Sequence, residues 1–144
     1  MVERAAIIAE ARTWIGTPYH HQASVKGAGC DCLGLVRGVW RGVYGTEPEA
    51  PPPYSRDWAE AHRQETLADA AGRHMLSVEL DNIAPGDVLL FALNERAPAK
   101  HCAILTEQDR MVHSYESHAV AEVSLSPWWR RRIRFAFAFP NLDL

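Results

Sequence analysis

Three cysteines and seven histidines are the residues of this sequence best suited to nucleophilic catalysis. Cys32 follows Asp31 at the point where a polar, glycine-bearing loop gives way to a predicted helix. The first turn of a helix presents free backbone N–H groups and the positive end of the helix dipole, and both lower the pKa of a thiol. Cys32 is therefore a candidate nucleophile. The alternative is a small buried hydrophobic residue, which is what most free cysteines are.

A thiol nucleophile needs a base, and the base needs a partner that orients it. His101 begins a predicted strand over 101–106, and His113 lies inside the next predicted strand over 111–115. The connection between them is of hairpin length, and side chains on one face of adjacent strands can meet. We interpret His101 as the base for Cys32 and His113 as its orienting partner.

The other thiols and imidazoles have simpler interpretations. Cys102 falls within the apolar pattern of a strand and is predicted to be core, whereas Cys30 lies in the loop and has no assigned role. The sequence has no Cys-x-x-Cys or His-x-x-x-His pair, so no metal or cofactor is predicted. The remaining histidines are interpreted as solvated side chains, with the first two as alternative substrate contacts: His20, His21, His62, His74 and His118.

The elements that must position these residues fall into two groups. Apolar residues recur at helical spacing over 3–15 and 32–44, and a polar surface helix is predicted over 58–73, after a proline-rich loop over 46–57. Strands are predicted over 88–91, 101–106, 111–115, 120–125 and 133–139, the last with clean alternation. Helices first and an antiparallel sheet second indicate an α+β fold, with the N-terminal helices packed on the sheet.

Length and composition limit the possible functions. The chain has 144 residues, of which 47% are hydrophobic, and its net charge is −3. This is the size of a single domain, over 1–144, and the charge argues against nucleic-acid binding. No stretch is apolar enough to span a membrane, and Glu10 interrupts the short apolar run that a signal peptide would need. We therefore expect synthesis in the cytoplasm and, for any action outside it, delivery by a partner.

Several short runs occur in an order and spacing that resemble the NlpC-type cysteine peptidases, bacterial and phage enzymes that cut cell-wall peptides. The resemblance covers roughly residues 5–125 and implies a compact papain-like α+β domain. The runs that match are Trp-Ile-Gly-Thr-Pro-Tyr at 14–19, Gly-Cys-Asp-Cys-Leu-Gly-Leu-Val at 29–36, Pro-Gly-Asp-Val-Leu-Leu-Phe at 85–91, His-Cys-Ala-Ile-Leu at 101–105 and Met-Val-His-Ser at 111–114.

By position, the resemblance implies that Cys32 is the nucleophile, His101 the general base and His113 the third catalytic member. It also implies that Tyr19 and Asp31 line the substrate site. Tyr19 would back the sulfur or donate to the oxyanion, and Asp31 would help to bind a substrate amine. Leu33 departs from the family pattern, because many members have serine directly after the cysteine.

The resemblance further implies hydrolysis of peptidoglycan stem peptides at the bond between D-glutamate and the diamino acid. The size and the start of the chain resemble the small single-domain peptidases of phages and gene transfer agents. Tail or baseplate proteins would then be partners, and the site of action would be the periplasm. The alternatives are a structural tail-tip or adaptor protein with a relic site, and an amidase or acyltransferase on the same fold.

Two segments remain open at this stage. The cluster Trp128–Arg132 is either a turn whose tryptophans cap the core or a surface for a protein partner or the anionic cell wall. The loop Pro48–Tyr54 would border the substrate groove or dock to a partner.

Overall fold

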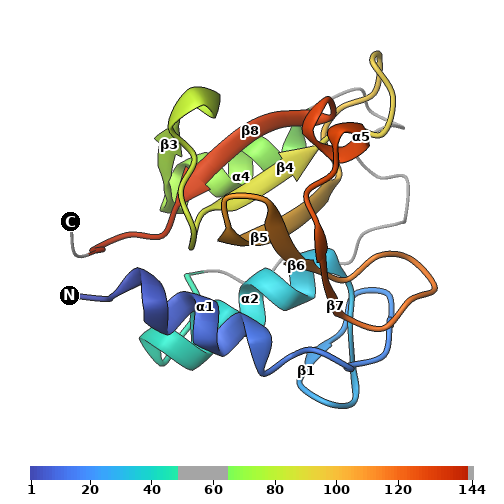
Figure 1. Ribbon diagram of the computed structural model, residues 1–144. Coiled ribbons are helices and arrows are strands. Elements are labelled where there is room, and N and C mark those ends of the chain that lie inside the picture. The colour runs from blue at the N-terminus through green and yellow to red at the C-terminus, as the bar shows by residue number, and fades with distance from the viewer. Residues whose placement is uncertain (49–64, 143–144) are drawn as a thin grey trace.

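The structure, a computed structural model, describes residues 1–48 and 65–142 and combines helices with a six-stranded antiparallel sheet (Figure 1). This confirms the predicted α+β class. The helical elements are α1 (Arg4–Arg12), α2 (Cys32–Tyr44), α4 (Thr66–His74), the 3₁₀ turn η1 (Leu80–Asn82) and α5 (Pro127–Arg130). The strands are β1 (Ser24–Val25), β2 (Gly29–Cys30), β3 (Leu76–Val78), β4 (Val88–Phe91), β5 (His101–Glu107), β6 (Arg110–His113), β7 (Ala121–Ser124) and β8 (Ile133–Ala138).

Helix α2 begins and ends where its sequence dictates. Asp31 is the N-cap, and its Oδ1 accepts a hydrogen bond of 2.7 Å from the backbone N–H of Gly34. Such a side-chain cap satisfies one of the N–H groups that the first turn leaves without a helical acceptor. Gly45 ends the helix in the left-handed region at φ 86°, a conformation that glycine adopts without a steric penalty. The predicted start at Cys32 is confirmed.

The glycines of α2 allow two other segments to approach closely. A Cβ at Gly38 would overlap the ring of Trp14, and a Cβ at Gly34 would overlap the backbone carbonyl of Ala23. The first contact fixes α2 against the end of the α1 segment. The second fixes the β1–β2 hairpin against the first turn of α2, next to Cys32.

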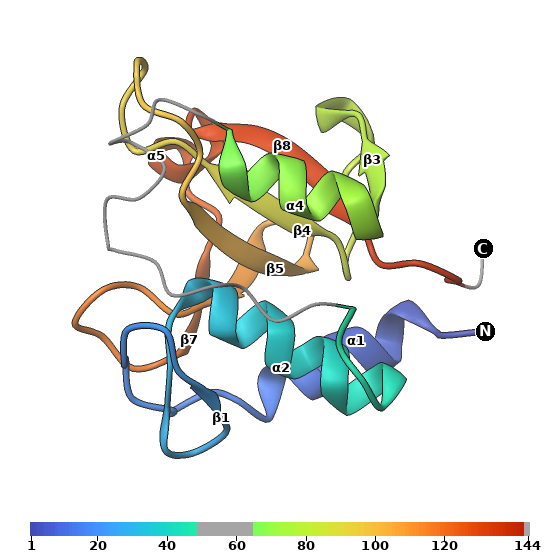
Figure 2. The ribbon, with the colours of Figure 1, turned by 180° about the vertical axis from the view of Figure 1, so that it is seen from behind.

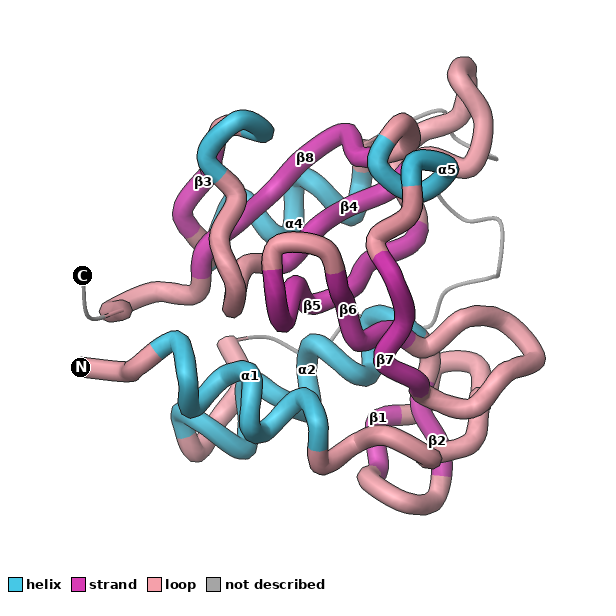
Figure 3. The backbone as a smooth tube through the Cα atoms, viewed as in Figure 1, coloured by secondary structure: helices cyan, strands magenta, loops and turns pink. Residues whose placement is uncertain are grey.

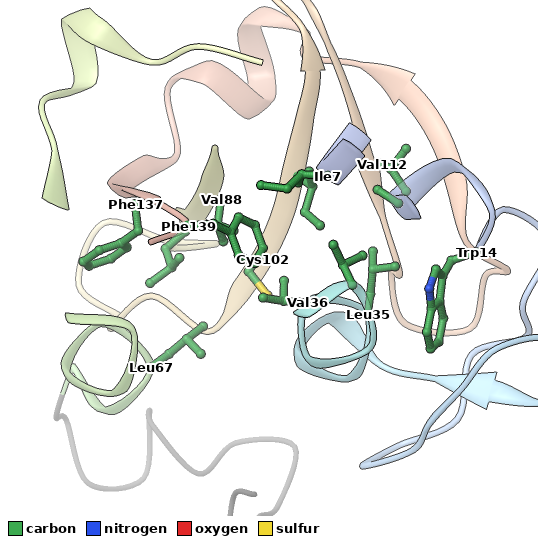
Figure 4. Close-up of a cluster of buried hydrophobic side chains, with 14 of the residues drawn as sticks. Ile7, Trp14, Leu35, Val36, Leu67, Val88, Cys102, Val112, Phe137 and Phe139 are labelled. Atoms are coloured by element: carbon green, nitrogen blue, oxygen red, sulfur yellow. The ribbon is translucent and has the colours of Figure 1, made fainter. Parts of the chain in front are cut away.

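The six strands are ordered β3-β8-β4-β5-β6-β7, and every pair of neighbours is antiparallel. One face of the sheet buries the main core against α1, α2 and α4 through residues such as Ile7, Leu35 and Leu67 (Figure 4). Seen from behind, α4 crosses β4 and β8, while α2 lies below β5 (Figure 2). The opposite face carries a second cluster that includes Leu89 and Phe91, onto which Trp129 of α5 packs.

The structure differs from the sequence predictions in several local features. The segment 20–31, predicted as a loop, contains the two-stranded sheet β1–β2, which is separate from the main sheet (Figure 3). Cys30 therefore lies in a strand, fully buried, and not in a loop. The predicted helix over 3–15 ends at Arg12, because turns lead to Gly16 at φ 92°. The sequence did not predict β1 and β2, because strands of two residues are too short to show a periodicity.

Other parts of the chain were predicted only in part, or lie partly outside the described residues. The helix predicted over 58–73 is observed from Thr66 to His74, and its positions 58–64 lie outside the described residues. Elements β3 and α5 were not predicted. Of the loop Pro48–Tyr54, positions 49–54 also lie outside the described residues. None of the helices in the described parts of the chain is long and apolar enough to cross a membrane.

Candidate active site

Cys32 is the first residue of α2, and its half-buried side chain lies next to the start of strand β5. Its Sγ lies 3.7 Å from the backbone carbonyl oxygen of Lys100, the residue directly before His101. Cys102, the residue after His101, is buried in the main core, and its sulfur points toward Val36 of α2 (Figure 4). The start of α2 and the start of β5 therefore meet at the Cys32 thiol.

The surroundings of Cys32 favour its thiolate. Its pKa is held well below the ordinary value for a thiol, chiefly by a hydrogen bond from Cys102 and next by the hydrogen bond and positive charge of His101. Burial acts in the opposite direction and is outweighed. The pKa of Cys102 is raised well above its ordinary value, chiefly because it donates to Cys32. Of these two thiols, Cys32 is thus the one whose thiolate is favoured, and Cys102 is its hydrogen-bond donor.

The structure joins the two predicted histidines directly. His101 Nε2 and His113 Nδ1 are 2.9 Å apart, and the two side chains are only 5% and 6% exposed. In the β5–β6 register His113 pairs with Ala103, so His101 lies diagonally from it on the same face. This confirms that the two imidazoles meet across adjacent strands.

The protonation of the pair follows from burial. The pKa of His113 falls to about 3, mainly because burial disfavours its charged form and also because His101 and His118 add positive charge nearby. His113 is therefore neutral near pH 7. We assign the His101 Nε2–H as donor to His113 Nδ1, which leaves His101 Nδ1 to exchange a proton with the Cys32 thiol.

The helix that holds Cys32 packs mainly on the other face of β5. Cys102 and Ile104 belong to the core between α2 and the sheet, whereas Ala103 belongs to the cluster on the opposite face, which His101 shares by alternation. The histidine pair therefore lies on the face of the sheet opposite to the one that this helix covers. His101 is nevertheless within reach of Cys32, because it is the first residue of β5 and lies at the end of the strand.

A cavity of about 390 Å³ opens at Cys32 and His101. The predicted substrate residues Tyr19 and Asp31 both line it, together with charged groups of both signs. His113 supports His101 through their hydrogen bond. The full lining is Tyr19, His21, Asp31, Cys32, Leu33, Leu67, Leu93, Lys100, His101, Ser114, Tyr115, Glu116 and Ser117.

Asp31 lines the cavity and also holds two backbone segments together. Its Oδ1 caps α2, and its Oδ2 accepts a bond of 2.7 Å from the backbone N–H of Gln22. His21 Nδ1 lies 3.9 Å from the same oxygen. The carboxylate thus ties the hairpin segment to the nucleophile's helix, and binding of a substrate amine by Asp31 stays a prediction. Tyr19 is fixed nearby through a backbone bridge to Cys30.

Sequence reasoning missed two neighbours of the catalytic group. Cys102 was interpreted as core alone, although a residue next to His101 on β5 necessarily points to the opposite face, toward α2. Trp129 packs against both His101 and His113, and no spacing in the sequence indicates this contact. Within the described residues, no group of three or more His, Cys, Asp or Glu side chains is arranged to hold a metal ion.

Comparison with known proteins assigns the chain and its fold to one family. The sequence model of the NlpC/P60 family matches residues 16–136, which include Cys32, His101 and His113. The chain belongs to the NlpC/P60 family. This confirms the predicted papain-like α+β domain and the family that the sequence motifs resemble.

One sequence relative and two solved structures illustrate the similarity of this NlpC/P60 chain to other proteins. It is 27% identical over 139 residues to the gamma-DL-glutamyl hydrolase of Bacillus subtilis (strain 168), covering 96% of the chain but only 30% of that relative. The NlpC/p60 domain of the peptidoglycan hydrolase SagA superposes with a TM-score of 0.67 at 24% identity, over 96% of this chain and 100% of that one. RipB, a peptidoglycan hydrolase of Mycobacterium tuberculosis, gives 0.62 at 18% identity, over 93% and 63%.

Proposed function

We propose that this chain is a cysteine endopeptidase that hydrolyses peptide bonds in the stem peptides of bacterial peptidoglycan. The observation that supports this best is the arrangement of three groups at one end of β5. The Cys32 thiol has a lowered pKa and is hydrogen-bonded to His101. His101 is in turn fixed by neutral His113, through a hydrogen bond of 2.9 Å between His101 Nε2 and His113 Nδ1. A nucleophile, a base and an orienting group in this order are what acyl transfer needs.

The reaction follows from these positions. His101 Nδ1 takes the proton of Cys32, and the thiolate attacks the peptide carbonyl to form a tetrahedral intermediate. The backbone N–H of Cys32 lies in the first turn of α2, where it can stabilise the oxyanion, assisted by Tyr19. His101 then protonates the leaving amine. Water, activated by the same imidazole, hydrolyses the thioester and restores the thiol.

We propose the bond between D-glutamate and the diamino acid as the cleavage point. The Bacillus subtilis relative is a gamma-DL-glutamyl hydrolase, which supports a γ-glutamyl substrate. The cavity is also suited to a peptide that bears both carboxylates and amines, because Lys100 lines it together with Asp31 and Glu116.

Digestion of purified cell-wall sacculi tests this proposal. The wild-type protein should release fragments whose masses correspond to cleavage within the stem peptide, and Cys32→Ala should keep the fold and release none. Cys102→Ala is a matched control at a thiol that does not attack the substrate, and it should retain measurable hydrolysis. Fragments cut between glycan and peptide would instead indicate an amidase, and a transferred acyl group an acyltransferase. No release by wild-type protein, with slow alkylation of Cys32, would indicate a structural protein with a relic site.

We also propose that the chain acts from the tail of a phage or a phage-like particle such as a gene transfer agent, docked to tail or baseplate proteins. Resemblance to the small phage peptidases supports this assignment. Mass spectrometry of purified particles tests it: presence of the chain in tail fractions is expected, and recovery only in the cytoplasmic fraction would contradict it.

A further inference from the structure

Trp129 lies against both histidines of the catalytic pair. Its ring centroid is 5.4 Å from that of His101, tilted by 32°, and 5.3 Å from that of His113, at 88°. Phe91 and Tyr115 complete its surroundings, with centroids at 5.1 Å and 5.6 Å. We propose that Trp129 is a positioning residue, whose indole holds the two imidazoles in their hydrogen-bonded geometry and shields that bond from water. This inference rests on the proposed cysteine peptidase function.

The contact comes from the side of the histidines that faces away from the substrate. The described residues that line the cavity do not include Trp129, which packs instead on the cluster of Leu89 and Phe91 behind the sheet. Tyr115 lies between the two regions, because it lines the cavity and also stacks on His113 at 5.8 Å and 19°. Trp129 therefore acts through the imidazoles and does not reach the substrate.

Hydrogen bonds of the main chain and of the Ser126 and Arg130 side chains fix the segment that carries Trp129. Ser126 Oγ accepts from the Trp129 N–H at 3.4 Å, and the Trp129 carbonyl accepts from the N–H of Arg132 at 2.9 Å. The Arg132 carbonyl in turn accepts from Ala92, which directly follows β4, at 3.0 Å. Arg130 donates to the carbonyl of Gln108 in the β5–β6 turn at 2.6 Å. The one-turn helix α5 is thus tied to the residue that follows β4 and to the turn between β5 and β6, the two strands that carry the histidines.

A fixed indole at this place has two physical consequences. It excludes water from the hydrogen bond between His101 and His113. Such a bond is stronger in surroundings of low dielectric constant. It also limits rotation of both imidazoles, which keeps His101 Nδ1 directed at the thiol. The lowered pKa of His113 is consistent with this cover, because burial is its main cause. Both consequences concern the protonation and orientation of the pair and leave substrate binding unchanged.

Alkylation of Cys32 by iodoacetamide, followed from pH 5 to pH 9, tests the role without any cell-wall substrate. In Trp129→Ala the loosened His101 should stabilise the thiolate less, so the rate at pH 6 should fall about tenfold while the rate at pH 9 changes less than about twofold. Trp129→Phe, which keeps a ring over the pair, should recover the wild-type profile within about threefold. Trp128→Ala is the matched control, since Trp128 is the exposed neighbour in α5 and should leave the profile unchanged.

Peptide hydrolysis gives a second readout. Trp129→Ala should lower kcat by about tenfold or more with KM within about twofold, because the indole does not line the cavity. An alkylation profile of Trp129→Ala that superimposes on the wild type would overturn the inference, as would an equal loss in Trp128→Ala. If Trp129→Ala shows no cooperative thermal unfolding, Trp129→Leu decides. This variant keeps apolar volume but uncovers part of the pair, so about a threefold loss at pH 6 is expected, and no loss overturns the inference.

The two proposals can fail separately. Failure of the wild-type protein to cut sacculi would refute the peptidase function while leaving the alkylation profiles interpretable. An unchanged profile in the Trp129 variants, with active wild-type protein, would refute only the role of Trp129.

Discussion

Replacing His113 by asparagine should make the stability of this protein less sensitive to acid. The His113 imidazole is 6% exposed, and folding lowers its pKa from an ordinary 6.5 to about 3. The folded chain therefore binds this proton more weakly than the unfolded chain does. The stability that depends on neutral His113 is complete above pH 6.5 and is lost progressively as the pH falls from 6.5 toward 3.

The magnitude follows from the two pKa values. One pKa unit corresponds to about 1.4 kcal/mol, so the full shift amounts to roughly 5 kcal/mol, reached only below pH 3. Between pH 7 and pH 5 the folded state leaves His113 neutral while the unfolded state takes up most of a proton. The loss in that interval is about 2 kcal/mol from this one side chain, a large share of the 5–15 kcal/mol that typically separates folded from unfolded domains.

Urea unfolding at pH 7 and pH 5 measures this directly. The free energy of unfolding of the wild type should fall by about 2 kcal/mol more than that of His113→Asn over this interval. The variant should start from a lower stability at pH 7, because its amide fills the site less well. His20→Asn, at an exposed loop position, is the control and should keep the wild-type dependence. Equal losses in wild type and His113→Asn would refute the conclusion that burial keeps His113 neutral, and with it the assigned tautomer of His101.

Three other expectations concern reactivity, catalysis and packing. Because its pKa is lowered, Cys32 should react with iodoacetamide below pH 7 at least about tenfold faster than the other two thiols, and labelling that begins only near pH 9 would contradict the thiolate assignment. His101→Ala should lower kcat/KM by about 10²-fold or more and His113→Ala by about tenfold, as measured with muropeptides, and a reversed order would exchange their roles. Gly38→Ala should destabilise the fold by about 1–3 kcal/mol in urea unfolding, because its methyl group overlaps a tryptophan ring, whereas Gly72→Ala at an exposed position of α4 should stabilise it by about 0.5–1 kcal/mol.

The placement of Cys32 and of the two histidines was predictable because it depends on local rules. The change from loop to helix at Cys32 is identifiable from sequence, and the structure confirms that α2 begins there, with Asp31 as its N-cap. Alternation along two strands joined by a short turn similarly brings His101 and His113 to one face, and the observed register confirms it. Gly34 and Gly38, four residues apart along α2, are positions where neighbouring segments approach the helix backbone closely.

Contacts between distant segments were beyond such rules. Which face of β5 receives α2 depends on how the helices and the sheet pack, and no local pattern in the sequence decides it. The structure confirms Cys102 as a core residue, and the same packing also makes it a hydrogen-bond donor to Cys32. The β1–β2 hairpin escaped prediction because two residues per strand show no period.

The sequence by itself determined the family, the α+β class, the helix start at Cys32 and the meeting of His101 and His113, because motifs, caps and alternation act over a few residues. Only the tertiary structure decided what surrounds them. The burial that keeps His113 neutral and the indole that covers the pair arise from chain segments far apart in sequence. Trp129 reaches His101 across 28 positions through the return of the chain from β7 to β8, and no local pattern encodes that distance.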